Sequence, residues 1–274
     1  MISVVNNGIG ALPGLGLQSI IEVIGQFIFA SLRIGSFLIA SPFLGAKFTI
    51  LPVRILIAMT LTLLIVSLNP EIPAIEVISS FSGVVIAITE ISIGLAAGLV
   101  LSIVFAAIGL AGEKIAASSG LSMATMVDPS SGGSTPVISQ ILTLFMLVIF
   151  TSYDGHLIVI RTIIESYEFL PIGSTIDPSI FIQAGILAAE TMFSSAALIM
   201  LPIALILLLI NTAIGVITRS APTLNLFSFG FPITMLGVFF ILYISIRSLG
   251  LSISDLADTA IFFMQDMIGA ISNG

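Results

Sequence analysis

The sequence predicts an all-α membrane protein that forms one integral-membrane domain over residues 1–274. Of its 274 residues, 58% are hydrophobic and 8% are charged, whereas an average soluble domain is about 25% charged. The mean hydropathy is +1.27. The chain also contains six apolar runs, and a helix that crosses a ~30 Å hydrocarbon core needs about 20 mostly apolar residues. Lipid or other apolar protein must therefore cover the excess of apolar surface.

The six runs follow one another along the chain with short breaks between them. They span residues 20–44, 51–68, 77–111, 137–164, 192–218 and 226–247. Proline removes a backbone donor and restricts the residue before it, so it is typical of helix boundaries. The breaks contain Asn69-Pro70, Pro73, Asp128-Pro129, Pro171, Asp177-Pro178 and Pro222. We therefore expect each run to form a helix of its own.

The tail of the chain, residues 249–274, combines apolar residues with acids. Leu256, Ile261, Phe262 and Met264 lie among Asp255, Asp258 and Asp266. This pattern predicts an amphipathic helix. Such a helix would either pack on a partner or an interface, or fray as the end of the chain.

The composition excludes several classes of protein. The absence of Cys rules out a disulfide framework, an iron–sulfur cluster and a thiolate zinc site, and His156 is the only histidine. The net charge is −7 and no run of Lys or Arg occurs, so we expect no nucleic-acid partner. Disordered chains combine low hydrophobicity with high charge, which this chain does not do. We expect no metal, no cofactor and no enzymatic activity.

Polar and charged residues lie within the apolar runs or close to their ends. An ionisable group at membrane depth costs about 3 kcal/mol on insertion scales, so each such residue needs a partner or a function. We expect buried contacts between helices or between subunits for Arg33, Glu90, Glu113, Lys114, Arg161, Glu190, Asn211 and Arg219. A site for a transported ion or proton is the alternative.

Two spacings indicate local helix contacts. Arg161 and Glu165 are one helical turn apart, which favours an ion pair within one helix. Gly94 and Gly98 form a small-xxx-small pattern, which lets two helix backbones approach closely. Such patterns are common in glycine-rich apolar chains, so this one predicts a helix contact and nothing further.

Residues 118–136 form the least regular segment of the chain. Their sequence, SSGLSMATMVDPSSGGSTP, is too polar and glycine-rich to span a membrane, yet too apolar for a freely solvated loop. Non-helical backbone at membrane depth occurs where it is buried in protein or lines a cavity, and methionine fills irregular gaps. The composition fits either a deformable plug in a conduit or a re-entrant turn at the surface.

The catalytic motifs in the sequence are incomplete. Gly120-Leu121-Ser122 is similar to the serine motif of rhomboid-type intramembrane proteases, but Met123 stands where that motif has glycine. Tyr153-Asp154 is similar to one aspartate motif of presenilin-like proteases, but the Gly-x-Gly-Asp partner motif is absent. No phosphate-binding G-x-x-x-x-G-K loop occurs. A protease that uses Ser122 and His156 stays an alternative without its full motif.

Four tracts of the sequence carry a family resemblance. They are LRIGSFLIASPFLGAKFTILPVRI (32–55), LSMATMVDPSSGGSTPVISQ (121–140), YDGHLIVIR (153–161) followed by FLPIG (169–173), and RSAPTLNLFSFGFPITM (219–235). Together they resemble the FliR family of flagellar export-gate proteins. The tracts occur in the right order over nearly the whole chain, which is far more specific than one motif. DPSSGG and RSAPTLNLF are more like the flagellar branch than the virulence-type secretion systems that share the fold.

This resemblance implies a structural and gating subunit of the export gate of a flagellar type III secretion system. Its location would be the bacterial inner membrane at the flagellar basal body. FliR-like proteins assemble with FliP-like and FliQ-like subunits into a helical, cone-like pore, contact an FlhB-like subunit and admit unfolded export substrates. We also expect contacts with an FlhA-like subunit and with membrane lipid. The hairpins of the family resemble fused FliP-like and FliQ-like units, and much of the assembly is lifted out of the membrane plane.

The resemblance also implies that the stretch from about 113 to 136 supplies a plug for the pore. The expected plug and gate residues are Gly120, Leu121, Met123, Met126, Asp128, Pro129, Gly132 and Gly133. Apolar side chains on a flexible backbone would seal the closed pore against ions and move aside for an unfolded chain. The driving energy would come from elsewhere, since the sequence contains no nucleotide site. Buried charges such as Arg33, Glu90 and Glu190 would then lie between subunits.

Two other functions stay open on the sequence. One is an export-gate subunit of a virulence-type, non-flagellar type III secretion system. The other is a secondary transporter, which would account for acids within the membrane and for broken helices.

Overall fold

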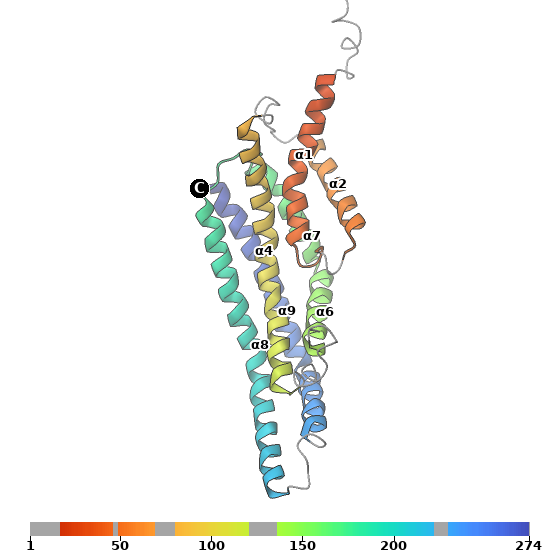
Figure 1. Cartoon of the computed structure of the whole chain (residues 1–274), viewed down its shortest axis with the longest axis vertical. Helices are drawn as coiled ribbons and strands as arrows, with labels where there is room; N and C mark the ends of the chain where they lie inside the picture. Colours follow the sequence, from red (N-terminus) through yellow and green to blue (C-terminus); the bar gives the residue numbers. More distant parts are fainter. Residues whose placement is uncertain (1–16, 46–48, 69–79, 121–135, 222–229, 274) are drawn as a thin grey trace, which may run out of the picture. The chain divides into compact units, whose positions relative to one another are not determined.

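The computed structural model describes residues 17–45, 49–68, 80–120, 136–221 and 230–273 (Figure 1). Within these residues the chain forms helices joined by turns and contains no β-strand, which confirms the all-α prediction. In chain order the helices are α1 (Leu17–Ala40), α2 (Leu51–Ser67), α4 (Phe81–Ser118), α6 (Val137–Ser152), α7 (Gly155–Phe169), α8 (Pro178–Ser220) and α9 (Phe231–Asn273).

Among the described helices, three are long and apolar enough to cross a membrane: Phe81–Ser118, Pro178–Ser220 and Pro232–Ile271. Taken together as one bent span, α6 and α7 are also long and apolar enough to cross a membrane, which would make four spans. α1 and α2 contain shorter apolar helical stretches, Ile24–Ala40 and Leu51–Ser67. Each of the six expected runs overlaps one described helix or the pair α6 and α7, and the differences concern where a helix breaks or continues, which hydropathy does not show.

Two boundaries illustrate this difference. The run 137–164 is divided at Asp154, whose backbone φ of 57° interrupts the helical conformation between α6 and α7. The run 226–247 and the tail 249–274 instead belong to one helix, α9. A single glycine, Gly250, does not end this helix, because Leu249 and Ile253 on either side of it are buried.

The described residues fall into two compact units. The first unit takes its residues from 1–100, 158–184 and 264–274, and the second from 101–157 and 185–263. In the first unit, α1 packs against α2. Its buried apolar side chains include Ile34, Phe37, Leu38, Ile93, Ala97 and Ile163, which come from α1, α4 and α7.

The core of the second unit comes from the C-terminal half of α4, from α6, from α8 and from α9, whose Val238, Ile253 and Ala260 are 0% exposed. Its buried apolar side chains include Leu101, Ile108, Ile115, Ile138, Met146, Ile199, Ile203 and Leu207. Phe105 of α4 meets Phe150 of α6 edge to face, with ring centroids 5.0 Å apart and an angle of 83° between the rings. This arrangement is favourable for an aromatic pair.

The glycine pair of α4 lies directly against α1 in the first unit. A Cβ at position 94 would overlap the carbonyl oxygen of Arg33 and the Oγ of Ser36. A Cβ at position 98 would lie 2.6 Å from the Cβ of Ala40 and 2.9 Å from the carbonyl oxygen of Phe37. The close helix contact predicted from the spacing of Gly94 and Gly98 is therefore confirmed.

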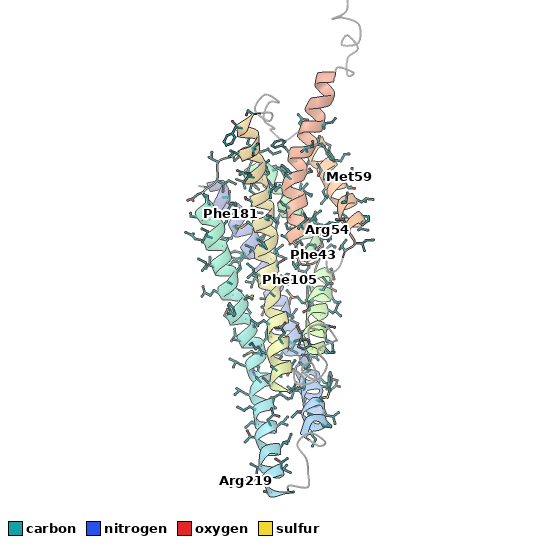
Figure 2. The ribbon with its side chains drawn as sticks, in the orientation of Figure 1. Phe43, Arg54, Met59, Phe105, Phe181 and Arg219 are labelled. Atoms are coloured by element: carbon teal, nitrogen blue, oxygen red, sulfur yellow. The ribbon has the colours of Figure 1, made fainter. Side chains whose placement is uncertain are left out.

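Large apolar surfaces of the chain stay exposed. Of the 18 residues that form the most apolar stretch of each helix, 22% are buried within the chain in α8, 22% in α9 and 50% in α4. On α2, Met59 is 54% exposed and its side chain projects outward from the ribbon (Figure 2). Apolar patches of this extent mark contact with other protein or with lipid. The chain therefore presents α2 and the most apolar stretches of α8 and α9 to a covering partner or to a bilayer.

The substitution Gly94→Ala is expected to destabilise the first unit. Overpacking costs about 1–3 kcal/mol, which exceeds the ~1 kcal/mol that alanine gains over glycine in a helix. Gly215→Ala in α8 is the matched control, because a Cβ there meets nothing within 4 Å. The midpoint of thermal unfolding, followed by circular dichroism in detergent, should fall for Gly94→Ala and stay equal or rise for Gly215→Ala. Equal midpoints for the two variants would contradict the close approach of α1 and α4.

Candidate functional site

Arg33 of α1 and Glu90 of α4 form a buried ion pair in the first unit. The Nε of Arg33 donates to Oε2 of Glu90 at 2.8 Å, and Nη2 donates to Oε1 at 3.1 Å, so the contact is bidentate. The exposed fractions of the two side chains are 0% and 1%. A buried charge is tolerated only beside an opposite charge with well-placed hydrogen bonds. The pair therefore sets the register of α1 against α4.

The other donors of Arg33 reach the C-terminal end of α7. Nη1 donates to the carbonyl oxygen and to the Oγ of Ser166, each at 3.0 Å, and Nη2 donates to the carbonyl oxygen of Leu170 at 2.9 Å. A guanidinium has five N–H donors, and these bonds together with those to Glu90 use all five. While the cluster is intact, Arg33 has no donor left for a transported anion.

The end of α7 explains why a cation lies at this place. The last carbonyl groups of a helix lack partners within the helix and carry a partial negative charge. Pro171, which follows Leu170, has no N–H with which to continue α7. Tyr167 completes the enclosure, because its hydroxyl donates to the carbonyl oxygen of Ala30 at 2.6 Å and its ring lies 4.2 Å from Cζ of Arg33. The cluster thus joins α1, α4 and α7.

Three members of this cluster were not identified from the sequence. Ser166 and Leu170 contribute carbonyl oxygens, which every residue possesses, and Tyr167 lies in a tract that gives no sign of its partner. The proline of FLPIG marks the end of a helix. It does not show which side chain covers the carbonyl groups of that end.

Most of the other polar residues singled out in the sequence lie on the surface of this chain. Arg161 pairs with Glu165 within α7, with Nε and Oε1 2.6 Å apart, which confirms the ion pair expected one turn apart. Arg219 stands at the end of α8 (Figure 2). The exposed side chains are Glu113, Lys114, Arg161, Glu190, Asn211 and Arg219. Burial of these side chains against another subunit is a proposal.

The C-terminal end of α4 is closed by local hydrogen bonds. The N–H and the Oγ of Ser119 donate to the carbonyl oxygens of Ile115 and Ala116 at 3.1 and 2.7 Å. The N–H of Gly120 donates to the carbonyl oxygen of Ala117 at 3.2 Å. Gly120 has a φ of 77°, the left-handed conformation that often follows a helix and that glycine adopts without strain.

The carbonyl group of Ser118, the last residue of α4, is paired across the second unit. It accepts a hydrogen bond of 2.9 Å from Nδ2 of Asn211 in α8. Asn211 therefore has a partner on another helix although its side chain is exposed. The contact joins two residues that are 93 positions apart, so no sequence spacing points to it.

The N-terminal end of α6 is packed on the same part of α4. The buried side chain of Ser139 donates through Oγ to the carbonyl oxygen of Gly109 at 2.9 Å. A Cβ at position 112 would lie 2.5 Å from Cα and 2.9 Å from N of Ser139. Gly112 therefore permits direct contact between the two backbones. Both ends of the segment between α4 and α6 are placed by contacts with neighbouring helices.

Most of the expected plug lies outside the described residues. This applies to Leu121, Met123, Met126, Asp128, Pro129, Gly132 and Gly133, whereas Gly120 is described. The stretch expected from about 113 begins later, because residues 113–118 continue α4. Residues 113–117, Glu-Lys-Ile-Ala-Ala, are compatible with a helix, whereas Gly120 favours the end of α4 just before it. The structure thus defines the two ends of the segment.

The residues that a protease or a metal site would use are described only in part. Within the described residues, no group of three or more His, Cys, Asp or Glu side chains could hold a metal ion. His156 is half-buried and its Nδ1 has no hydrogen-bond partner among these residues. Ser122, the nucleophile that a protease would use, lies outside them.

Comparison with known proteins places these features in a family context. The family described as "Bacterial export proteins, family 1" matches residues 24–260. The flagellar biosynthetic protein FliR of Escherichia coli (strain K12) is 33% identical over 210 residues, which cover 76% of this chain and 79% of that protein. Its namesake in Pectobacterium carotovorum is 34% identical, with 77% and 80% covered, and that of Bacillus subtilis (strain 168) is 24% identical, with 93% and 99% covered.

The substitution Arg33→Ala is expected to destabilise the protein by about 3–5 kcal/mol, because it leaves the carboxylate of Glu90 buried without its counter-ion. The double substitution Arg33→Met with Glu90→Leu should cost less, since no unpaired charge is left. It should not restore full stability, because the carbonyl group of Leu170 loses its donor. Thermal unfolding in detergent measures all three variants.

Arg161→Ala is the matched control for this series. It also removes an arginine from an ion pair with a glutamate, but the side chain of Arg161 is 78% exposed. Solvent screens such a pair, so the unfolding midpoint should stay close to that of the unaltered protein. An effect of Arg161→Ala as large as that of Arg33→Ala would contradict the special role of burial.

Proposed function

The chain belongs to the family of bacterial export proteins, family 1, and we propose that it is the FliR-type subunit of a flagellar export gate in the bacterial inner membrane. It is a membrane component of the flagellar export apparatus rather than an enzyme. The observation that carries the proposal is the family match over residues 24–260, which includes part or all of every described helix. The proposal also covers the partner subunits of the chain, its place in the pore and the plug of that pore.

The exposed apolar helices support assembly with other subunits. The three long helices are apolar enough to cross a membrane, yet this chain buries only 22% of the most apolar stretch of α8 and of α9. We propose that FliP-like and FliQ-like subunits cover part of these faces, with FlhB-like and FlhA-like subunits at the same gate and lipid on what is left. Glu190, exposed on α8 beside Ile186 and Leu187, would then contact a polar group of a neighbour.

The proposed arrangement of the chain is that of hairpins fused in series. α1 and α2 pack against each other, which is the contact that one such hairpin requires. In the family resemblance these hairpins correspond to FliP-like and FliQ-like units. The chain would take the place of such units in a helical ring around the pore.

The proposed gating is passive. Leu121, Met123 and Met126 would seal the closed pore against ions, on a backbone made adaptable by Gly132 and Gly133. Methionine suits this task because its flexible, apolar side chain can repack around a passing chain of any sequence. The described ends of the segment support the proposal, since Gly120 and Ser139 give it defined points of attachment.

Co-purification is the direct test of the assembly. The tagged chain, expressed together with FliP-like and FliQ-like proteins, should yield one discrete hetero-oligomer when the detergent-solubilised material is weighed by native mass spectrometry. The chain expressed without these partners is the control and should give no particle of that mass. A monomer or homodimer that ignores both partners would contradict the export-gate proposal and favour a secondary transporter.

Deletion of residues 123–132 tests the plug. The assembled complex should form with the mass expected for the shortened chain, while reconstituted vesicles should lose K⁺ several times faster, because the apolar seal is gone. Replacement of Met123 and Met126 by serine should act in the same direction without changing the length of the segment. An unchanged K⁺ barrier in an assembled deletion complex would refute the plug.

A further inference from the structure

Arg54 is a cation that the described residues do not neutralise. It lies in the first turn of α2, at the end of the hairpin where the chain turns back from α1 (Figure 2). Its side chain is half-buried, because it shares one face of α2 with the buried Thr62 and Ile65. Nη2 donates to the carbonyl oxygen of Thr49 at 3.2 Å. In the described part of the chain this is the one hydrogen bond of the guanidinium, and no carboxylate pairs with it.

The other donors of Arg54 are left over at the turn of the hairpin. Nε is buried and has no hydrogen-bond partner among the described residues. Nη1 also has no partner among them and is not fully buried. A guanidinium has five N–H donors, so a group that approaches from outside the chain finds most of them unused.

Comparison with Arg33 shows what Arg54 lacks. Arg33 meets the carboxylate of Glu90 and uses all five donors. At Arg54 the acceptor is a single neutral carbonyl group. Burial of a cation is unfavourable unless an opposite charge and further hydrogen bonds compensate for the loss of water. An anion from outside this chain would complete the surroundings of Arg54.

The hairpin of α1 and α2 carries no acid that could serve as this anion. Residues 23–70 contain three basic residues and no Asp or Glu. Glu90 of α4 is already paired with Arg33. The hairpin is therefore electropositive, and the same hairpin of a second copy of the chain could not supply the missing charge.

An apolar surface begins directly beside this cation. Arg54 is the only charged residue of α2. The exposed apolar side chains of the helix include Leu51, Ile55, Leu56, Met59 and Leu63. Arginine near the end of an apolar helix places its charge at the level of lipid headgroups while its stem stays on apolar surface. A cation at one end of a bare apolar helix is complementary to a phospholipid, in which a phosphate stands at one end of apolar chains.

We propose that the turn end of the α1–α2 hairpin binds a phospholipid, with the phosphate on the guanidinium of Arg54 and the acyl chains along the exposed side of α2. Phosphate oxygens match the paired N–H donors of a guanidinium. The lipid supplies both the missing counter-ion and an apolar cover, which a soluble anion cannot do. An acidic lipid binds best, because the hairpin has an excess of positive charge.

Lipid binding to the purified full-length chain tests this site. The chain in mild detergent is titrated with phosphatidylglycerol, and the lipid-bound species are counted by native mass spectrometry. Arg54→Gln should weaken binding of the first lipid about tenfold, since hydrogen bonds between two charged groups are lost. Arg54→Lys should have an intermediate effect, because an ammonium group is a point charge without paired donors. Unchanged affinity in the folded Arg54→Gln chain would overturn the proposal.

Arg161→Gln is the matched control. It removes the same charge from the chain, but Arg161 is largely exposed and pairs with Glu165. Its affinity for phosphatidylglycerol should equal that of the unaltered chain. An equal loss in Arg54→Gln and Arg161→Gln would mean attraction by net charge alone and would refute a site at Arg54.

Two further ligands separate the parts of the lipid and use the unaltered chain, so they do not depend on the folding of a variant. Diacylglycerol with the same acyl chains lacks the phosphate and should bind several-fold more weakly than phosphatidylglycerol. Glycerol phosphate has the phosphate without the chains and should not displace the lipid at equal concentration. Equal binding of diacylglycerol, or displacement by glycerol phosphate, would contradict a phospholipid site.

The co-expressed complex distinguishes a lipid from a neighbouring subunit as the source of the anion. The lipid site predicts that the Arg54→Gln complex keeps its protein mass and retains one phosphatidylglycerol fewer than the unaltered complex. Impaired assembly of Arg54→Gln, with unchanged lipid affinity of the isolated chain, would assign the anion to a carboxylate of a neighbour and overturn the lipid site. The proposed site lies within this chain alone, so its failure would leave the export-gate proposal standing.

Discussion

The buried guanidinium of Arg33 is the interaction on which the arrangement of the first unit depends. A charge with 0% exposure needs an opposite charge and a partner for every donor, and α1 alone supplies neither. Glu90 must therefore come from α4 and the carbonyl groups of Ser166 and Leu170 from the end of α7. The absence of a side chain at Gly94 allows the backbones of α1 and α4 to come close enough for this pairing.

Two helix ends among the described residues accept hydrogen bonds from side chains of other helices. The carbonyl groups at the end of α7 receive Arg33, and the last carbonyl group of α4 receives Asn211. In a water-soluble protein, solvent can satisfy such groups, but an apolar environment leaves them unpaired at a cost of several kcal/mol. The charged and the neutral donor solve the same problem in different ways. Arg33 is enclosed and joins three helices, whereas Asn211 makes one accessible bond.

The exposed apolar faces have a simple thermodynamic consequence. α4 buries half of its most apolar window within the chain, while α8 and α9 bury 22% each. The chain on its own therefore leaves a large apolar area that lipid or other protein must cover. This agrees with the membrane export family to which the chain belongs.

Composition and spacing by themselves determined the class of this protein and its local contacts. With 58% hydrophobic residues the chain must avoid water, whichever way its helices are arranged. The one-turn spacing of Arg161 and Glu165 and the spacing of Gly94 and Gly98 determine contacts on one helix face, because the helical repeat is fixed. Four sequence tracts in the right order were sufficient to identify the family to which the chain belongs.

Only the tertiary structure decided which distant groups meet. Glu90 lies 57 positions from Arg33, and Asn211 lies 93 positions from Ser118. Hydropathy also placed a boundary near residue 248 where α9 continues, and a continuous run where Asp154 breaks the helix. The physical reason is the same in each case. The rotation and register of a helix, and the carbonyl groups left at its end, are determined by the side chains that must be buried and paired against it.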